Sequence, residues 1–353
     1  MDRDSELYPL MLEPLERELV WGGDALVRRY GKPGSAQASI GESWECWDAN
    51  RVTNGAYAGK SLGDVRAELG ERLVGSADPA RIFPLLTKLI DAHAALSVQV
   101  HPDDAYAQRV EKQPFGKAES WLILDAQSDA SIVLGWNRDT SRGEYLERVR
   151  DGSLDALLRR VFVHPGDVFD LPAGTLHAIG AGIVLFETQQ ASDLTYRIFD
   201  YNRPGPDGKP RELNVDKAAD VLDYRESRAG ALRSLEYELD RLARTTLIAN
   251  RRFIVERIAL TSEPRGVDLE GMPLIVMALG LPVEVETCGV VARLEAYRTA
   301  VVPAAARVAM LRSVGVEATL VTAAPPADAY AIERRYSRSG VAVSESSAFL
   351  AQF

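Results

Sequence analysis

GDVFDLPAGTLH, residues 166–177, is the stretch of this sequence that decides its fold. It follows the pattern G-x5-P-x-G-x2-H. Gly166 permits a turn, Pro172 and Gly174 shape a tight hairpin corner, and His177 is projected inward from the strand that follows. The pattern therefore predicts a small antiparallel β-structure with an imidazole facing its interior.

Polar side chains upstream of this stretch are predicted to face the same interior. Gln99 and His101 in LSVQVHPDD lie two residues apart on an expected strand over 94–100, so they share one face. Lys117 and Glu119 in GKAESWLIL repeat this relation at the start of the next strand. Burying such groups unpaired in an apolar interior would be costly, which favours a shared role for them.

The combination of these residues predicts a metal site. Two imidazoles, a carboxylate and an amide form a ligand set that suits a catalytic zinc or a similar divalent ion. The sequence holds only four histidines, so a metal site has few other places to be. We expect Gln99, His101, Glu119 and His177 to converge on one cation.

Short apolar runs separated by Gly, Pro and Asp turns dominate the rest of the chain and are typical of a mainly β protein, a barrel or a sandwich. Helical spacing of apolar residues predicts helices as insertions. These fall at 62–74, 81–91, 103–112, 143–160 (as two helices broken near Gly152) and 215–222.

After about residue 235 the chain shows alternating strand patterns with almost no helical spacing. This change predicts that the chain has three parts. Residues 1–235 hold the candidate site and the helical insertions, and 236–324 form a second, smaller β-domain. That second domain contains no histidine, so no second metal site of this type is expected there. Residues 325–353 are polar and Ser-rich, which predicts a tail that is disordered or laid loosely on the surface, with a docking strand as the alternative.

Composition limits the classes of partner. The net charge of −10 argues against a nucleic-acid binder, although an anion pocket for a phosphorylated small molecule needs only a few local cations. The acidic start lacks a signal-peptide layout, and no apolar run approaches a membrane span, so we expect a cytoplasmic protein without membrane contact. Cys46 and Cys288 are expected to be free thiols rather than a disulfide.

The stretch 166–177 resembles the second conserved motif of the cupin superfamily, small β-barrels that hold a metal between strands. The usual Asn four residues after the histidine is replaced by Ala181. Together, LSVQVHPDDAYA, GKAES and LPAGTLHAIGAGIVLFETQQASDLTYRIFDYNR resemble the type I phosphomannose isomerases, as do VWGGDAL (20–26) and IGESWECWD (40–48). The resemblance covers roughly residues 14–225 and implies a cupin (jelly-roll) barrel, with a second, smaller β-barrel matched only in pattern.

The resemblance also implies a cofactor and a reaction. In that family the residues matching Gln99, His101, Glu119 and His177 bind zinc, so we expect one Zn²⁺ per chain, although other divalent metals suit such a site. The implied reaction interconverts mannose 6-phosphate and fructose 6-phosphate through an enediol. The expected partner is thus a small sugar phosphate, and the chain is expected to be a monomer or a weak homodimer.

Such an isomerase needs an acid/base group, stabilisation of the enediolate and a phosphate grip. Glu187, which the family places in the active site, is the first candidate for proton transfer, and Lys117 is the alternative; both could instead form a salt bridge in the pocket wall. Arg197 matches a family arginine implicated in catalysis. Ser97 and Arg203 could complete a phosphate clamp, although Arg203 could equally be a solvated loop charge.

Two other functions are weighed against the isomerase. Two histidines and a carboxylate also suit Fe(II) in a cupin oxygenase, but the amide Gln99 and the charged groups at Lys117, Glu187 and Arg197 argue against it. A cupin sensor or storage protein that has lost its chemistry would lack ligands or the acid/base set, and this sequence retains them. The isomerase is therefore the preferred hypothesis.

Overall fold

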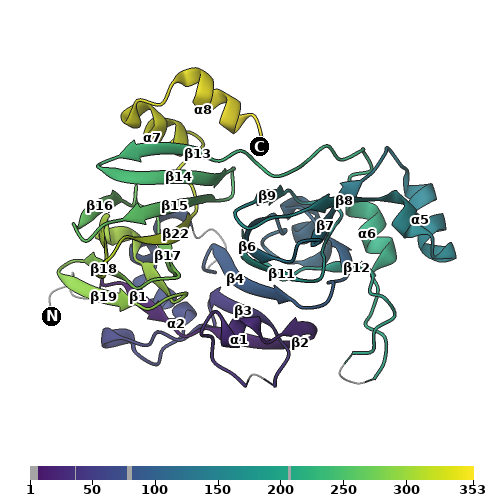
Figure 1. Cartoon of the computed structure of the whole chain (residues 1–353), viewed down its shortest axis with the longest axis horizontal. Coiled ribbons are helices and arrows are strands. Elements are labelled where there is room, and N and C mark those ends of the chain that lie inside the picture. The colour runs from purple at the N-terminus through teal and green to yellow at the C-terminus, as the bar shows by residue number, and fades with distance from the viewer. Residues whose placement is uncertain (1–6, 36, 78–81, 206–207) are drawn as a thin grey trace.

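The computed structural model describes residues 7–35, 37–77, 82–205 and 208–353, which form two β-sandwiches side by side (Figure 1). The expected mainly β architecture is confirmed. The first sandwich joins a six-stranded and a five-stranded antiparallel sheet. The larger sheet runs β2 (Leu15–Gly23), β3 (Ile40–Cys46), β4 (Leu85–Ala92), β11 (Ile183–Gln190), β6 (Glu119–Ala126) and β9 (Val168–Leu171). The smaller runs β12 (Tyr196–Phe199), β5 (Val98–Val100), β10 (His177–Ile179), β7 (Ser131–Trp136) and β8 (Leu158–Phe162).

Alternation along β11 explains how the larger sheet buries both of its faces. Leu185 points into the first sandwich, where it packs with Trp121 and Ile179 in one apolar cluster. Phe186, the next residue, points to the opposite face and packs in another cluster. Every residue of β11 is buried, as a strand covered on both faces requires.

The second sandwich begins close to the predicted division at residue 235. Its seven-stranded sheet runs β1 (Leu10–Leu12), β20 (Thr299–Val302), β17 (Leu274–Leu279), β22 (Ala318–Ala324), β15 (Ile254–Leu260), β14 (Leu242–Ala249) and β13 (Leu235–Leu239). Its four-stranded sheet runs β16 (Arg265–Asp268), β21 (Val308–Ser313), β18 (Val283–Thr287) and β19 (Val290–Leu294). Among the strands of these two sheets, only β1 lies wholly before residue 235, and it pairs with β20.

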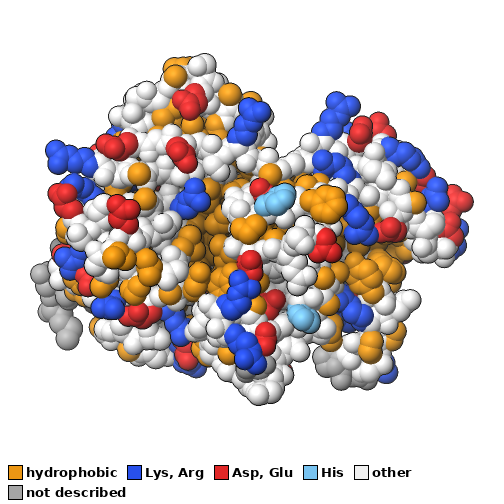
Figure 2. All heavy atoms as spheres, viewed as in Figure 1, with side chains coloured by type: hydrophobic (Ala, Val, Ile, Leu, Met, Phe, Trp, Pro, Cys, Tyr) orange, Lys and Arg blue, Asp and Glu red, His pale blue; other side chains and the backbone are white. Residues whose placement is uncertain are grey.

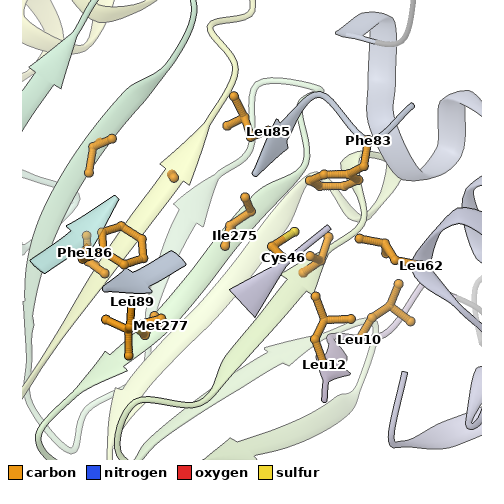
Figure 3. Close-up of a cluster of buried hydrophobic side chains, with 14 of the residues drawn as sticks. Leu10, Leu12, Cys46, Leu62, Phe83, Leu85, Leu89, Phe186, Ile275 and Met277 are labelled. Carbon is orange, nitrogen blue, oxygen red and sulfur yellow. The ribbon is translucent and has the colours of Figure 1, made fainter. Parts of the chain in front are cut away.

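The two sandwiches share one apolar core. The outer face of the six-stranded sheet contributes Leu89 and Phe186, and the seven-stranded sheet contributes Ile275 and Met277 (Figure 3). These four side chains are at most 2% exposed. Because neither sheet could leave such a face in water, the arrangement of the two sandwiches is fixed by burial of apolar surface.

Most of the predicted helices are confirmed. The segment 62–74 forms α2 (Leu62–Leu69) and α3 (Glu71–Val74), 103–112 forms α4 (Asp104–Tyr106) with a π-turn over Ala107–Glu111, and 215–222 forms α6 (Val215–Val221). A further short helix is α1 (Ala25–Arg28). Of the two helices predicted over 143–160, α5 (Arg142–Asp151) ends at Gly152, whose φ is 75°. The second is wrong, because a single 3-10 turn at Leu154–Leu157 leads into β8.

The helix predicted over 81–91 is wrong, although residue 81 itself lies outside the described residues. Residues from Leu85 onward form β4 in the centre of the six-stranded sheet, and all eight of its residues are buried. A strand covered on both faces has a nearly continuous apolar run, in which three- and four-residue spacings occur without a helix. The error concealed that Lys88 points into the first sandwich.

The tail prediction is also wrong. Residues 325–353 include α7 (Ala331–Ser339) and α8 (Val343–Leu350), which lie over β13 at the top of Figure 1. Ile332, Tyr336 and Phe349 pack in one buried cluster with Leu235 and Tyr237 of β13. The polar composition concealed an amphipathic helix, whose few apolar residues all fall on one face.

Three further properties bear on the predictions. Cys46 is buried and Cys288 exposed, and both are free thiols, as expected. No helix in the described part of the chain is both long and apolar enough to cross a bilayer. Acidic and basic side chains are interspersed across the face in Figure 2, which is hollowed between the part that carries α8 and the part that carries α5.

Candidate metal centre

The four predicted ligands converge from both sheets of the first sandwich. Gln99 lies on β5 and pairs in register with His177 at the start of β10. His101 follows the end of β5, and Glu119 opens β6 in the facing sheet. Ligand atoms of His101, Glu119 and His177 all lie within 4.8 Å of one another, and all three residues are buried. The structure thus brings together the side chains that the sequence predicted to share one cation, and their role as ligands stays a prediction.

Backbone carbonyls orient both imidazoles. His101 Nδ1 lies 2.8 Å from the carbonyl oxygen of Leu194, and His177 Nδ1 lies 2.8 Å from that of Thr175. Since a carbonyl oxygen can only accept, each Nδ1 carries the proton and each Nε2 offers a lone pair to the interior. The Trp121 ring packs edge-on against His177, with centroids 5.5 Å apart, and further fixes that ring.

Burial keeps both histidines neutral. Burial, reinforced by the positive charge of Lys117, lowers the pKa of His101 to about 3. Burial also lowers the pKa of His177. Neutral imidazoles are the form that binds a metal, so the pocket holds these two ligands ready at physiological pH.

Glu119 stands between the two imidazoles. Its Oε1 lies 3.2 Å from His101 Nε2 and its Oε2 lies 3.6 Å from His177 Nε2. Lys117 Nζ lies 2.7 Å from Oε1. Burial alone would raise the pKa of Glu119, but the positive charge of Lys117 counters it, and the pKa lies well below its usual range. Glu119 is thus a carboxylate at neutral pH.

Gln99 completes the ligand set from the β5 side. Its Nε2 lies 3.2 Å from His177 Nε2, and its Oε1 accepts a hydrogen bond from Ser97 Oγ at 3.3 Å. A half-turn about the last side-chain torsion of Gln99 exchanges the positions of its amide nitrogen and oxygen. In that orientation the amide oxygen, rather than Nε2, would face an ion held among the four side chains. Ser97 therefore contacts the ligand Gln99 as well as lining the site.

The donor atoms at this centre fit a divalent metal ion. His101 Nε2 and both carboxylate oxygens of Glu119 are buried and lack a well-oriented hydrogen-bond partner among the described residues. Orphaned buried acceptors are costly unless something else binds them. Two nitrogen donors, one carboxylate and one amide oxygen match the preferences of zinc.

A row of cross-strand neighbours borders the centre on the six-stranded sheet. Lys88 of β4, Glu187 of β11 and Trp121 of β6 are aligned in register. Lys88 Nζ lies 3.2 Å from Glu187 Oε1, and the Trp121 indole N–H donates to Glu187 Oε2 at 3.0 Å. Burial raises the pKa of Glu187, with a further rise from Glu119 that Lys88 and Lys117 counter only in part. The pKa of Glu187, the carboxyl predicted from the sequence to transfer the proton, is thus set by specific neighbours.

A cavity of about 230 Å³ opens onto these groups. Among the predicted site residues it is lined by Ser97, Gln99, Lys117, Glu119, Glu187 and Arg197. Arg203 does not line it. Its guanidinium donates to the carbonyl oxygen of Ala95 and to Asp200 Oδ1, each at 2.6 Å. Arg203 thus ties two segments together beside the site.

Several residues that line the cavity were not selected from the sequence. They are Arg17, Glu42, Trp44, Lys88, Asp193, Thr195 and Arg211, together with apolar side chains. One signal was available for Lys88, a charged residue inside an otherwise apolar run. Arg211 lies among several charged residues of a loop, and nothing in its sequence context separates it from them.

Comparison with known proteins gives a consistent result. Residues 10–143 match the family model of the phosphomannose isomerase type I catalytic domain. Mannose-6-phosphate isomerase ManA of Bacillus subtilis (strain 168) is 44% identical over 222 residues, which are 61% of this chain and 68% of that protein. GmuF, a probable mannose-6-phosphate isomerase of the same organism, is 41% identical over the same shares.

Solved structures extend the match beyond those 222 residues. The crystal structure of the mannose 6-phosphate isomerase from Bacillus subtilis has a TM-score of 0.81 at 30% identity, covering 89% of this chain and 99% of that one. The Salmonella typhimurium enzyme bound to its substrate (f6p) and a zinc atom has a TM-score of 0.69 at 17% identity, over 89% of this chain and 98% of that one. At that identity the second match shows the fold.

Proposed function

The chain belongs to the type I phosphomannose isomerase family, and from this premise we propose that its centre interconverts mannose 6-phosphate and fructose 6-phosphate. The single observation that carries the proposal is the convergence of His101, Glu119 and His177, whose donor atoms lie buried within 4.8 Å of one another. The solved relative from Salmonella typhimurium holds both a sugar phosphate substrate and zinc, which supports the same pairing here.

Gln99, His101, Glu119 and His177 would hold the metal. A bound divalent ion acts as a Lewis acid that polarises the substrate carbonyl and stabilises the negative charge of an enediolate. The rest of the chemistry belongs to the protein. Aldose–ketose isomerisation moves one proton between C1 and C2, so a group that both accepts and donates a proton must face the cavity.

We keep Glu187 as the first candidate for that proton transfer. Its carboxyl lines the cavity, and burial raises its pKa toward the working pH, as suits a group that must change protonation state. Lys117 remains the alternative, but its Nζ lies 2.7 Å from Glu119 Oε1 and neutralises that carboxylate. This contact supports an electrostatic role for Lys117.

Arg197 is proposed to stabilise anionic charge on the substrate. It lines the cavity from β12, directly opposite Gln99 of β5 in register. Its buried Nε lacks a hydrogen-bond partner among the described residues, so it can receive an anion. A guanidinium suits both a phosphate and an enediolate. We further propose that the enzyme works in the cytoplasm as a monomer or weak homodimer.

The proposal is tested by metal content and a coupled assay of fructose 6-phosphate conversion. Purified protein should contain about one divalent ion per chain, and a chelator should abolish turnover that zinc restores. His101→Ala and His177→Ala should lose both metal and turnover. His164→Ala is the matched control, because that side chain is 77% exposed and lies outside the centre. Full activity of a metal-free preparation would contradict the proposal.

A further inference from the structure

Two arginines, Arg211 and Arg203, share the buried carboxylate of Asp200 beside the cavity. Asp200 follows β12 and is 4% exposed. Arg211 binds it through two contacts, Nε to Oδ2 and Nη2 to Oδ1, both at 2.6 Å. Arg203 Nη2 lies 2.6 Å from the same Oδ1. Burial alone would raise the pKa of Asp200, but Arg211 and Arg203 outweigh it and lower the pKa.

Arg197 adds a third guanidinium to this group without a carboxylate of its own. Its Nη1 donates to the carbonyl oxygen of Glu212 at 3.2 Å, and its backbone N–H donates to Asn214 Oδ1. Burial lowers the pKa of Arg197, and the charge of Arg211 adds to the effect. The two like charges are therefore close, and both residues line the cavity.

The charge at this end of the cavity is not balanced. Three partly buried guanidinium groups are accompanied here by buried Asp200 and by exposed Glu212, so positive charge exceeds negative charge. The two lysines of the cavity differ, because Lys88 lies 3.2 Å from Glu187 and Lys117 lies 2.7 Å from Glu119. Partly buried cations in excess favour the binding of an anion. The phosphate of a sugar phosphate has the charge and the oxygen geometry that paired guanidiniums bind best.

We propose that Arg211 and Arg197 together bind the substrate phosphate, and that Asp200 is a positioning residue that holds Arg211 toward the cavity. Arg203, which the sequence suggested for the clamp, ties the segment to Ala95 instead. Because Asp200 engages Nε and Nη2 of Arg211, Nη1 of that guanidinium has no hydrogen-bond partner among the described residues and is available for a phosphate oxygen. The identity of the substrate in this inference rests on the proposed function.

Steady-state kinetics of Arg211→Ala, Arg211→Lys and Asp200→Asn test the inference. Loss of a charge-assisted contact that binds substrate and transition state alike raises KM and spares kcat. Arg211→Ala should raise KM for fructose 6-phosphate about tenfold to a hundredfold, with kcat within about threefold of the wild type. Arg211→Lys should show a smaller rise in KM than Arg211→Ala. Lysine keeps the positive charge but lacks the paired N–H donors of a guanidinium group. Asp200→Asn should raise KM with unchanged metal content.

Binding of inorganic phosphate to the zinc-loaded protein, measured by calorimetry, gives a readout that does not depend on isomerase activity. Arg211→Ala should weaken this binding about tenfold or more. Arg225→Ala is the matched control, because Arg225 binds Asp223 with the same two-contact geometry but is 85% exposed and lies outside the cavity. It should leave both KM and phosphate binding unchanged.

Two results would overturn the inference. One is an unchanged KM and unchanged phosphate binding in Arg211→Ala. The other is a larger loss of phosphate binding in Arg203→Ala than in Arg211→Ala. That result would show that Arg203, and not Arg211, binds the phosphate. The wild-type protein could lack isomerase activity and still bind phosphate more tightly than Arg211→Ala does. That result would refute the proposed reaction and support the phosphate-binding role of Arg211.

Discussion

The protonation state and orientation of each residue in this centre depend on the neighbouring atoms that it contacts. The carbonyl oxygens of Leu194 and Thr175 fix the tautomers of His101 and His177, and those two contacts come from the backbone. Lys117 keeps Glu119 ionised although that carboxylate is buried. The ligand atoms are therefore ready for a metal before one arrives, which reduces the reorganisation that binding requires.

Trp121 connects the metal ligands to the proton-transfer candidate. It donates its indole N–H to Glu187 and packs its ring against His177. Trp121→Phe removes that hydrogen bond while retaining most of the ring volume. We expect kcat to fall about tenfold, with zinc content unchanged and KM within about threefold, because a hydrogen bond to a charged group contributes about 1.5–3 kcal/mol. Coupled kinetics and elemental analysis measure these quantities.

Trp136→Phe provides the control for this substitution. Trp136 is 1% exposed and donates its indole N–H to the carbonyl oxygen of Asp223, outside the centre. It should destabilise the protein without changing kcat at 25 °C. An equal loss of kcat in both variants would show that Trp121 acts through packing alone.

Asp170 of β9 makes stability depend on pH. Burial raises the pKa of Asp170 to about 6, and the Asn250 side chain, which donates to it at 2.9 Å, offsets this only in part. The folded state therefore binds the proton more tightly than the unfolded chain, in which the pKa is near 3.8. The cost of ionising Asp170 in the folded state appears as pH rises from about 4 to about 6 and stays at its full value above that range.

Asp170→Asn should remove this cost. At pH 8 we expect the free energy of unfolding to rise by about 1–2 kcal/mol, below the roughly 3 kcal/mol that the full pKa shift implies, because the side chain is partly exposed. At pH 4 the difference should nearly vanish. Thermal unfolding at both values measures it, and a variant that is less stable than the wild type at pH 8 would refute the account.

At the scale of elements, α7 is fastened to the second sandwich by charge as well as by apolar contacts. Arg335 lies 2.9 Å from Glu256 of β15 and 2.9 Å from Glu270, and its side chain is 11% exposed. Glu256 is buried and also accepts from Tyr237 of β13. Burial alone would raise the pKa of Glu256, but Arg335 and Arg244 lower it. Arg335 of α7 thus neutralises the buried carboxylate of Glu256 on β15.

Arg335→Ala should test this dependence. It leaves Glu256 with Arg244 as its remaining cation, at 3.4 Å. Removing one partner of a buried ion pair costs about 3 kcal/mol or more. We expect a lower Tm with unchanged kcat/KM at 25 °C, since no residue of α7 lines the cavity of the centre. Arg338→Ala on the same helix is the control, because its pair with Asp240 is about half exposed and should contribute about 1 kcal/mol or less.

For the whole molecule, the shared core makes the two sandwiches one unit of folding. Phe186 lies on the outer face of β11, and Glu187, the next residue, lines the cavity. The strand that carries the proton-transfer candidate is therefore supported from behind by the second sandwich, in particular by Ile275 and Met277 (Figure 3).

Phe186→Ala should destabilise the entire chain. A buried Phe replaced by Ala costs about 3–5 kcal/mol, and unfolding should remain a single transition because both sandwiches lose the same contact. Phe162→Ala is the control, since Phe162 of β8 is 69% exposed, and its effect should stay within about 0.5 kcal/mol. Calorimetry that resolves two independent transitions in Phe186→Ala would contradict the shared-core interpretation.

The sequence by itself determined the mainly β class and the cupin fold, and it selected the four candidate ligands, because these depend on local signals. A turn motif ending in a histidine and pairs of polar residues two apart on strands are short-range patterns, and the whole chain holds only four histidines. Glu187, Lys117 and Arg197 were also selected from sequence, and the structure places each of them on the cavity wall.

Only the tertiary structure decided which charges reach the centre and how the buried strands pair. Lys88 was hidden because β4 is covered on both faces, so its spacing imitates a helix. Arg211 lines the cavity and Arg203 does not, although both contact Asp200, and the direction of a loop side chain follows no period in the sequence. The helical tail and the shared core also depend on surfaces that exist only after folding, since amphipathic segments are stabilised by what they pack against.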